Sequence, residues 1–221
     1  MLLSKYEFGS YLSYCSKGDE GPKDELRKKS RTVMYMLKQD KSISNPPIVF
    51  SKYIAQRIKN ELNDLPFKNF FGEDVYLVPV PGHSLRREGS LWIAENLAKA
   101  LESQGLGKVF SCLERIQKVQ KSAYCRGKDR PKPMDHYNTI RIKSLMKHMQ
   151  APKRIVLIDD LITRGSTMLG CVNVLKDAYP TASMMGFAVM RTISDISLFK
   201  DIKDPQVGTV EYRNANLWRE P

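Results

Sequence analysis

The chain has 221 residues, a formal net charge of +12 and four cysteines that form no Cys-x-x-Cys pair. Its length suits one α/β domain with a modest accessory region. The positive charge implies an anionic partner, and the cysteine spacing disfavours a zinc site or a disulfide framework. No apolar run approaches a membrane span, so we expect a cytoplasmic, reduced protein with no membrane partner.

The N-terminal region, residues 1–48, has an irregular and partly helical pattern. The apolar periodicity of 24–38 predicts a basic helix. After a break at Asn45-Pro46-Pro47, residues 50–62 predict a second helix. We therefore expect 1–48 to form a small helical accessory region.

The rest of the chain alternates between strand and helix patterns. Strands are predicted over 75–80, 109–113, 139–142, 155–159 and 183–190, and helices over 90–103 and 166–178. This alternation favours a parallel sheet with right-handed crossovers, in which ligands bind at the C-terminal ends of strands. The last thirty or so residues are harder to interpret, although 207–212 has the pattern of an edge strand.

The most informative segment is 154–167, Arg-Ile-Val-Leu-Ile-Asp-Asp-Leu-Ile-Thr-Arg-Gly-Ser-Thr. An apolar strand is followed by two acids, a polar loop and the start of a helix. Backbone N–H groups of 163–167 are expected to face outward, with the positive end of the helix dipole behind them. Such a loop suits a phosphate, and Ser166 and Thr167 can add hydroxyl donors.

The adjacent acids Asp159 and Asp160 repel phosphate, but carboxylates accept hydrogen bonds well from the neighbouring hydroxyls of a sugar. A phosphate beside a vicinal diol describes a ribose 5-phosphate. The alternative is a plain turn in which an Asp caps the helix. That alternative explains neither the two adjacent acids nor the Thr-Arg-Gly-Ser-Thr loop.

Residues 155–167 closely resemble, without a gap, the 5-phosphoribosyl-1-pyrophosphate (PRPP) motif of the type I phosphoribosyltransferases. The resemblance implies the fold of that family: α/β, with a twisted, mainly parallel sheet flanked by helices and a small N-terminal helical hood. It implies catalytic roles for Asp159 and Asp160. The residues implied to bind PRPP are Thr163, Arg164, Gly165, Ser166 and Thr167. Arg164 departs from the family pattern, since many members carry a small residue there.

A second segment, 79–89, follows the first predicted core strand. Its glycine lets the backbone approach a ligand closely, and its arginines can neutralise charge. Together with the helix that follows, it resembles the ComF family, the competence-associated branch of the phosphoribosyltransferases. The residues implied to bind pyrophosphate are Pro81, Gly82, His83, Arg86 and Arg87. An ordinary solvated turn and helix entry remain the alternative.

The basic stretch 114–130 lies between two short predicted strands, and so long a connection usually marks a functional lid or disorder. In the type I fold this position holds the flexible loop that closes over PRPP and excludes water. The residues implied for this loop are Arg115, Lys118, Lys121 and Arg126. A solvated charge run is the alternative.

We therefore expect an N-terminal hood over 1–48, a phosphoribosyltransferase core over 49–195 and a C-terminal tail over 196–221. Many ComF members begin with a cysteine-rich zinc module, but this N-terminal region contains only Cys15. The resemblance therefore does not extend to that module or to a partner carried by it.

The implied reaction is attack of a nucleophile on C1 of PRPP with loss of pyrophosphate. The implied cofactor is Mg²⁺, held through PRPP near Asp159 and Asp160 rather than by a separate set of protein ligands. Thr163 occupies the position of an Asp that handles a purine proton in hypoxanthine–guanine enzymes. A Thr cannot act as a base near neutral pH, which argues against 6-oxopurine salvage.

A different class of function also fits the sequence. A catalytically weak, PRPP-sensing or single-stranded nucleic-acid-binding protein of the ComF type accords with the surplus of positive charge. A glutamine-dependent amidophosphoribosyltransferase relative fits less well, because the chain has no glutaminase domain. The acceptor and the oligomeric state, monomer or homodimer, stay open.

Overall fold

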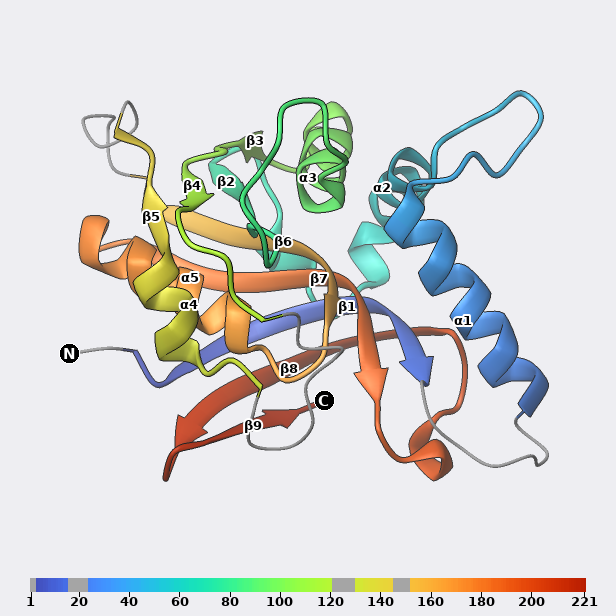
Figure 1. Cartoon of the computed structure of the whole chain (residues 1–221). Helices are drawn as coiled ribbons and strands as arrows, with labels where there is room; N and C mark the ends of the chain where they lie inside the picture. Colours follow the sequence, from blue (N-terminus) through green and yellow to red (C-terminus); the bar gives the residue numbers. More distant parts are fainter. Residues whose placement is uncertain (1–2, 16–23, 121–129, 145–151) are drawn as a thin grey trace.

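The structure is a computed structural model that describes residues 3–15, 24–120, 130–144 and 152–221. Its centre is a seven-stranded sheet with the order β3-β2-β6-β7-β1-β8-β9 (Figure 1). The five strands from β3 to β1 run parallel, and β8 and β9 continue the sheet in antiparallel pairs. The strands are β1 (Lys5–Cys15), β2 (Val75–Pro79), β3 (Lys108–Val109), β6 (Arg154–Ile162), β7 (Ser183–Ile193), β8 (Lys203–Arg213) and β9 (Asn216–Glu220).

Helices cover both faces of the sheet. One set consists of α1 (Asp24–Gln39), α2 (Phe50–Glu61) and α3 (Ile93–Ser103), and the other of α4 (Pro133–Thr139) and α5 (Ser166–Ala178). A small antiparallel sheet of β4 (Leu113–Arg115) and β5 (Ile140–Ile142) adjoins α4. Single 3₁₀ turns complete the fold, η1 (Leu62–Asp64), η2 (Lys68–Phe70) and η6 (Ile196–Leu198).

Strand β6 shows why the sheet is covered on both sides. Val156 and Ile158 pack into the core with α1, α2 and α3, whereas Ile155 and Leu157 pack into the second core with α5. All four side chains are fully buried, as expected for a central parallel strand with a continuous apolar sequence. The predicted fold class, α/β with a mainly parallel sheet flanked by helices, is confirmed.

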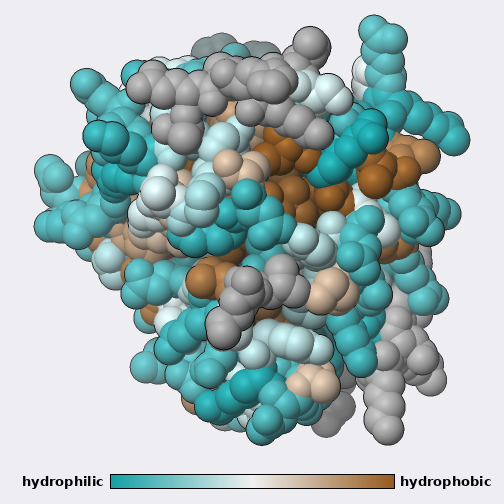
Figure 2. Space-filling view, turned by 90° about the vertical axis from the view of Figure 1, so that its left-hand side faces the viewer, coloured by the Kyte–Doolittle hydropathy of each residue, from teal (hydrophilic) through white to brown (hydrophobic). Residues whose placement is uncertain are grey.

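The outer surface is largely hydrophilic on the side of α4 and α5, and hydrophobic residues gather near the centre of this face and toward the right of the view (Figure 2). A groove between α4, β5 and α5 has apolar walls that include Ile140, Ile142 and Val174. Among the described residues, no helix combines the length and the apolar composition needed to cross a bilayer.

The predicted helices and most predicted strands are confirmed, but the irregular N-terminal pattern is wrong for residues 5–15. That segment is β1, which pairs with β7 on one side and β8 on the other. Its buried Ser10 and Ser13 interrupt the apolar run that marks a central strand. Arg191 donates to the Ser10 hydroxyl, and Ser13 donates to Asp204. The hood assigned to 1–48 stays a prediction.

One further prediction is corrected, and one helix was not predicted. Strand β8 is not an edge strand, because β9 pairs with its outer side. The helix α4, Pro133–Thr139, lies between the basic stretch 114–130 and β5 and was not predicted. Pro133 occupies the first turn of this helix, where a proline is favoured, and Asp135 accepts a hydrogen bond from the Lys132 amide at 2.8 Å.

Candidate functional site

The loop between β6 and α5 needs a glycine at its last position. Gly165 has φ +84° and precedes the first turn of α5. A Cβ there would lie 2.6 Å from Val210 and 2.7 Å from the Tyr6 hydroxyl. The Tyr6 hydroxyl also donates to the Gly165 carbonyl at 3.2 Å. Side chains of β1 and β8 therefore pack directly against the loop, and only glycine fits at position 165.

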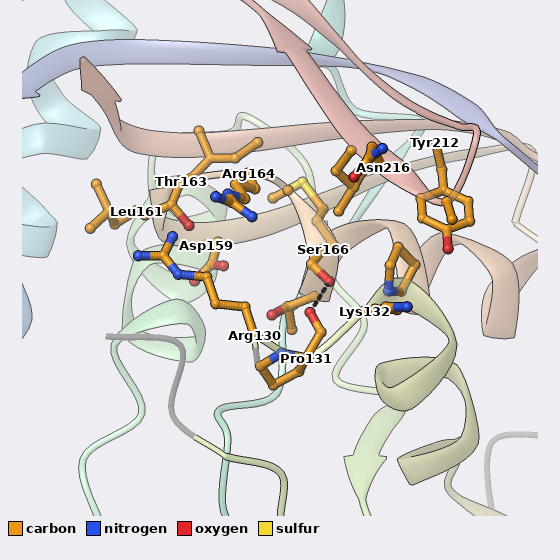
Figure 3. A pocket seen from close by; sticks show the side chains of 17 residues that line it. Arg130, Pro131, Lys132, Asp159, Leu161, Thr163, Arg164, Ser166, Tyr212 and Asn216 are labelled. Atoms are coloured by element: carbon orange, nitrogen blue, oxygen red, sulfur yellow. Dashed lines mark hydrogen bonds between the residues drawn. The ribbon is translucent and has the colours of Figure 1, made fainter. Parts of the chain in front are cut away.

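Above this loop lies a cavity of about 330 Å³. Side chains from β6, from the loop, from the segment before α4 and from the β8–β9 hairpin surround it (Figure 3). Among the described residues, the cations that line it are Arg130, Lys132 and Arg164, and Asp159 is the single acid. The first N–H groups of α5 have no partner within the helix, and the helix dipole adds positive potential. The cavity therefore suits an anion.

The two hydroxyls at the start of α5 differ. Ser166 donates to the Pro131 carbonyl at 2.7 Å, so its proton already has an acceptor within the protein (Figure 3). Ser166 lines the cavity, and its donation to a phosphate, which requires the hydroxyl to leave the Pro131 carbonyl, stays a prediction. Thr167 lies 3.3 Å from His136 through its Oγ1 and has no other side-chain hydrogen bond among the described residues. It remains available to donate.

The acidic pair lies within β6 just before the loop. Asp160 is buried, and its Oδ2 lies 2.6 Å from the Lys38 ammonium of α1. Asp159 accepts a hydrogen bond from the Asp160 amide at 2.8 Å. Burial, together with the neighbouring Asp160 carboxylate, raises the pKa of Asp159 well above its usual range. Burial opposes the charge on Lys38, but Asp160 outweighs it and raises the pKa of Lys38.

A second cavity of about 250 Å³ joins the acidic pair to the turn after β2. Asp159 and Thr167 line both cavities, so the two are neighbours. The structure therefore brings together the acidic pair, the start of α5 and three residues predicted for pyrophosphate. Those three are Pro81, Gly82 and His83.

The remaining basic residues predicted for pyrophosphate, Arg86 and Arg87, do not line this second cavity. Arg86 pairs with Glu95 at 2.9 Å and stacks over the Trp92 ring at 4.7 Å. It lines a neighbouring cavity that shares Pro81, Gly82 and Trp92 with the second one, whereas Arg87 lines none of these cavities. Both partners of Arg86 neutralise or cover its guanidinium, so the geometry favours a structural role for this residue.

The residues predicted for the flexible loop fall into different places. Lys118 is exposed and lines neither cavity of the site. Lys121 and Arg126 lie outside the described residues. The first part of the loop is attached to the site, because the Val119 amide donates to the His83 carbonyl at 2.9 Å.

Arg115 is not a mobile, solvated loop residue but is 6% exposed. Its Nε donates to the Gly82 carbonyl. Its two terminal nitrogens contact Thr139 Oγ1 at 2.8 Å and His136 Nδ1 at 3.2 Å. The predicted strand 109–113 is instead two short strands, β3 and β4, and β4 runs from Leu113 to Arg115, so Arg115 points inward like Leu113.

Several residues of the site were not predicted from the sequence: Lys38, Tyr6, His136, Tyr212 and Asn216. The Pro-Met-Asp-His sequence at 133–136, with proline and an acid in a first turn, indicates a helix and could have identified the setting of His136. The sequence around each of the other residues does not indicate a role in the site, because they lie on strands, helices or turns far from the loop in sequence.

The chain matches no protein-family model and no curated protein. Among solved structures, it is similar to a hypoxanthine phosphoribosyltransferase from Staphylococcus aureus. The sequence identity is 13%, the TM-score is 0.34, and the match covers 65% of this chain and 75% of that chain. So distant a likeness leaves the fold class to rest on the sheet topology and the function to rest on the site.

Proposed function

We propose that this chain binds PRPP with Mg²⁺ and transfers its phosphoribosyl group to an acceptor, releasing pyrophosphate. The observation that carries the proposal is the pair of neighbouring cavities that share Asp159 and Thr167. One contains a glycine-dependent loop at a helix N-terminus, and the other joins two carboxylates to a glycine-containing turn. A phosphate, a diol and a second anionic group are the chemical features that these surfaces recognise.

In this proposal each region binds one part of the ligand. The loop 163–167 holds the 5-phosphate through backbone N–H groups and the Thr167 hydroxyl. The ribose hydroxyls donate to Asp159 and Asp160, and the pyrophosphate lies toward the turn 81–83 and Lys38. The acceptor forms a bond to C1 as the C1–oxygen bond breaks, and pyrophosphate leaves with that electron pair. The chain's contribution is mainly positioning and stabilisation of charge.

The donor set fits a magnesium ion that is held largely by the ligand. Among the described residues, no group of three His, Cys, Asp or Glu side chains could hold a metal. Mg²⁺ commonly binds through one or two carboxylates together with substrate phosphates. Asp159 and Asp160 would supply the protein's share, and the ion would spread the charge of the leaving pyrophosphate.

Calorimetry with PRPP and Mg²⁺ tests the proposal on the wild type and on Asp160→Asn. We expect binding in the micromolar range and a loss of about 1–3 kcal/mol in the variant, the value for a hydrogen bond to a charged group. Asp64→Asn, which changes an exposed acid outside the site, is the matched control. Equal PRPP affinity in wild type and Asp160→Asn would remove the acidic pair from the site. Pyrophosphate release over a panel of nucleobases then identifies an acceptor.

A second candidate is the ComF-type protein that binds PRPP or single-stranded nucleic acid without strong catalysis. The observation that favours it is Arg213, which stacks over the half-exposed Trp218 at 5.2 Å on the β8–β9 hairpin next to the basic cavity. An aromatic ring beside cations suits stacked bases and a phosphate backbone. Steep salt dependence of oligonucleotide binding, without pyrophosphate release, would support this candidate over the transferase.

A further inference from the structure

A continuous contact path runs from Gly82 to Thr167 through the buried residues Arg115 and His136. Arg115 holds the Gly82 carbonyl with Nε and reaches His136 Nδ1 with a terminal nitrogen at 3.2 Å. The other ring nitrogen, His136 Nε2, lies 3.3 Å from Thr167 Oγ1. His136 and Arg115 are buried, so the middle of the path is shielded from solvent, whereas Gly82 is exposed and Thr167 is half-buried.

The direction of each hydrogen bond follows from the donors. A guanidinium has no acceptor, so His136 Nδ1 must accept from Arg115. The proton of the neutral ring is then on Nε2, which donates to Thr167 Oγ1. Burial and the Arg115 charge lower the pKa of His136 to about 4, which keeps the ring neutral in ordinary buffers. Because Thr167 accepts from His136, its own proton is free to point into the cavities.

Close packing between two helices places the imidazole. A Cβ on Gly170 of α5 would lie 2.5 Å from the Cβ of His136 and 2.9 Å from the Pro133 carbonyl. A glycine in the interior of a helix costs about 1 kcal/mol relative to alanine. Here it allows α4 to approach α5 closely enough for the ring to reach Thr167.

The charge of Arg115 supports an anion nearby. No carboxylate lies within ion-pair distance of its guanidinium in the part of the chain that the structure describes, where its acceptors are a carbonyl, a hydroxyl and an imidazole. A buried cation surrounded by neutral acceptors leaves a positive potential that a bound anion can balance.

We propose that Arg115 and His136 are positioning residues that hold Thr167 as a hydrogen-bond donor to the phosphate of the ligand. This inference rests on the proposed function and deepens it, because it names what orients the donor. It also means that one guanidinium holds both the turn at Gly82 and, through His136, the start of α5. The 5-phosphate and pyrophosphate sides of the site are thereby anchored to the same side chain.

Two substitutions of His136 separate positioning from packing. Gln places an amide N–H near the Nε2 position and keeps the donation to Thr167. Asn places an oxygen near the Nδ1 position and keeps only the contact with Arg115. We expect His136→Asn to weaken binding of inorganic phosphate and of ribose 5-phosphate about tenfold, and His136→Gln to stay within about threefold of wild type. Thr167→Val should match His136→Asn, and the double variant should lose no more than either single one.

The readout includes a signature that a purely structural role would not produce. Nitrogen-15 NMR of the wild type should show the Nε2–H tautomer of His136 at neutral pH. An Nδ1–H tautomer would overturn the inference, as would equal phosphate affinity in wild type, His136→Asn and Thr167→Val. If His136→Asn fails to fold, the tautomer of His136 in the wild type and the phosphate affinity of Thr167→Val still test the positioning role.

The inference and the proposed function can fail separately. Phosphate binding that depends on His136 as expected, in a protein that does not bind PRPP, would sustain the positioning role and reject the transferase. PRPP binding that is unaffected by His136→Asn would reject the positioning role and leave the proposed transferase standing. A wild type that binds neither phosphate nor ribose 5-phosphate would overturn the positioning role too, since Thr167 would have no anion to meet.

Discussion

The β6–α5 segment and the strands β1 and β8 both shape the loop at 163–165, but they differ in their sequence signals. The first is contiguous and contains a strand, two acids, a glycine and a helix start within 154–178. The second comes from the two ends of the chain, where Tyr6 and Val210 meet beneath Gly165. The conformation of the loop therefore depends on contacts with Tyr6 and Val210, which the sequence around the loop does not reveal. The predictions below test how far the loop depends on each region.

The largest effect is expected for Gly165→Ala. The new Cβ would be strained at φ +84° and would collide with Val210 and Tyr6. We expect a loss of about 2–4 kcal/mol in the free energy of unfolding, from backbone strain and overpacking together. Chemical denaturation measures it. Gly82→Ala is the control, because a Cβ there meets no atom within 4 Å; a similar loss in both variants would contradict this account.

A double-mutant cycle with Val210→Ala separates strain from collision. Removing the Val210 methyl groups gives the new Cβ room, while the backbone strain at residue 165 remains. We expect Gly165→Ala to cost about 1–2 kcal/mol less in the Val210→Ala background than in the wild type. If the losses in unfolding free energy of Gly165→Ala and Val210→Ala are additive, contact with Val210 of β8 does not restrict residue 165.

Asp159→Asn should make the protein more stable at neutral pH. The folded pKa of Asp159 lies above its ordinary value of 3.8, mainly through burial, so the folded state binds this proton more tightly than the unfolded state. Stability is then lost as the pH rises through the folded pKa, and Asn avoids that loss. We expect a rise of about 2–4 °C in Tm at pH 7, corresponding to about 1 kcal/mol.

The same pair of proteins supplies the control for that prediction. Near pH 3 Asp159 is largely protonated in both states, and so the difference in Tm between wild type and variant should nearly disappear. Thermal melts from pH 3 to pH 8 test this trend. A difference that stays constant with pH would exclude ionisation of Asp159 as its cause.

The smallest effect is expected for Tyr6→Phe. It removes the hydrogen bond to the Gly165 carbonyl and keeps the ring that packs under the loop. We expect a loss of about 0.5–1.5 kcal/mol in unfolding free energy, the usual range for one hydrogen bond. Tyr76→Phe, whose ring packs on Phe110 and whose hydroxyl makes no hydrogen bond to a described residue, is the matched control. Equal losses in the two variants would show that the loop does not need this contact.

The sequence alone determined the parts of the site that are continuous in the chain. The apolar run from Ile155 to Ile158 is long enough to mark a buried strand, and Gly165 followed by Ser166 marks a helix start. Prediction of the helix over 166–178 agrees with α5 at both ends. Such elements are set by backbone propensity and by the period of apolar residues, which are properties of neighbouring positions.

Only the tertiary structure decided which side chains meet. Lys38 reaches Asp160 across 122 positions of sequence, and Arg115 lies buried against Gly82 and His136 instead of in solvent. Ser166, although it is in the motif, turns to Pro131. The physical reason is that hydrogen bonds and ion pairs depend on distances of about 3 Å. Those distances are set when strands and helices from both ends of the chain pack together.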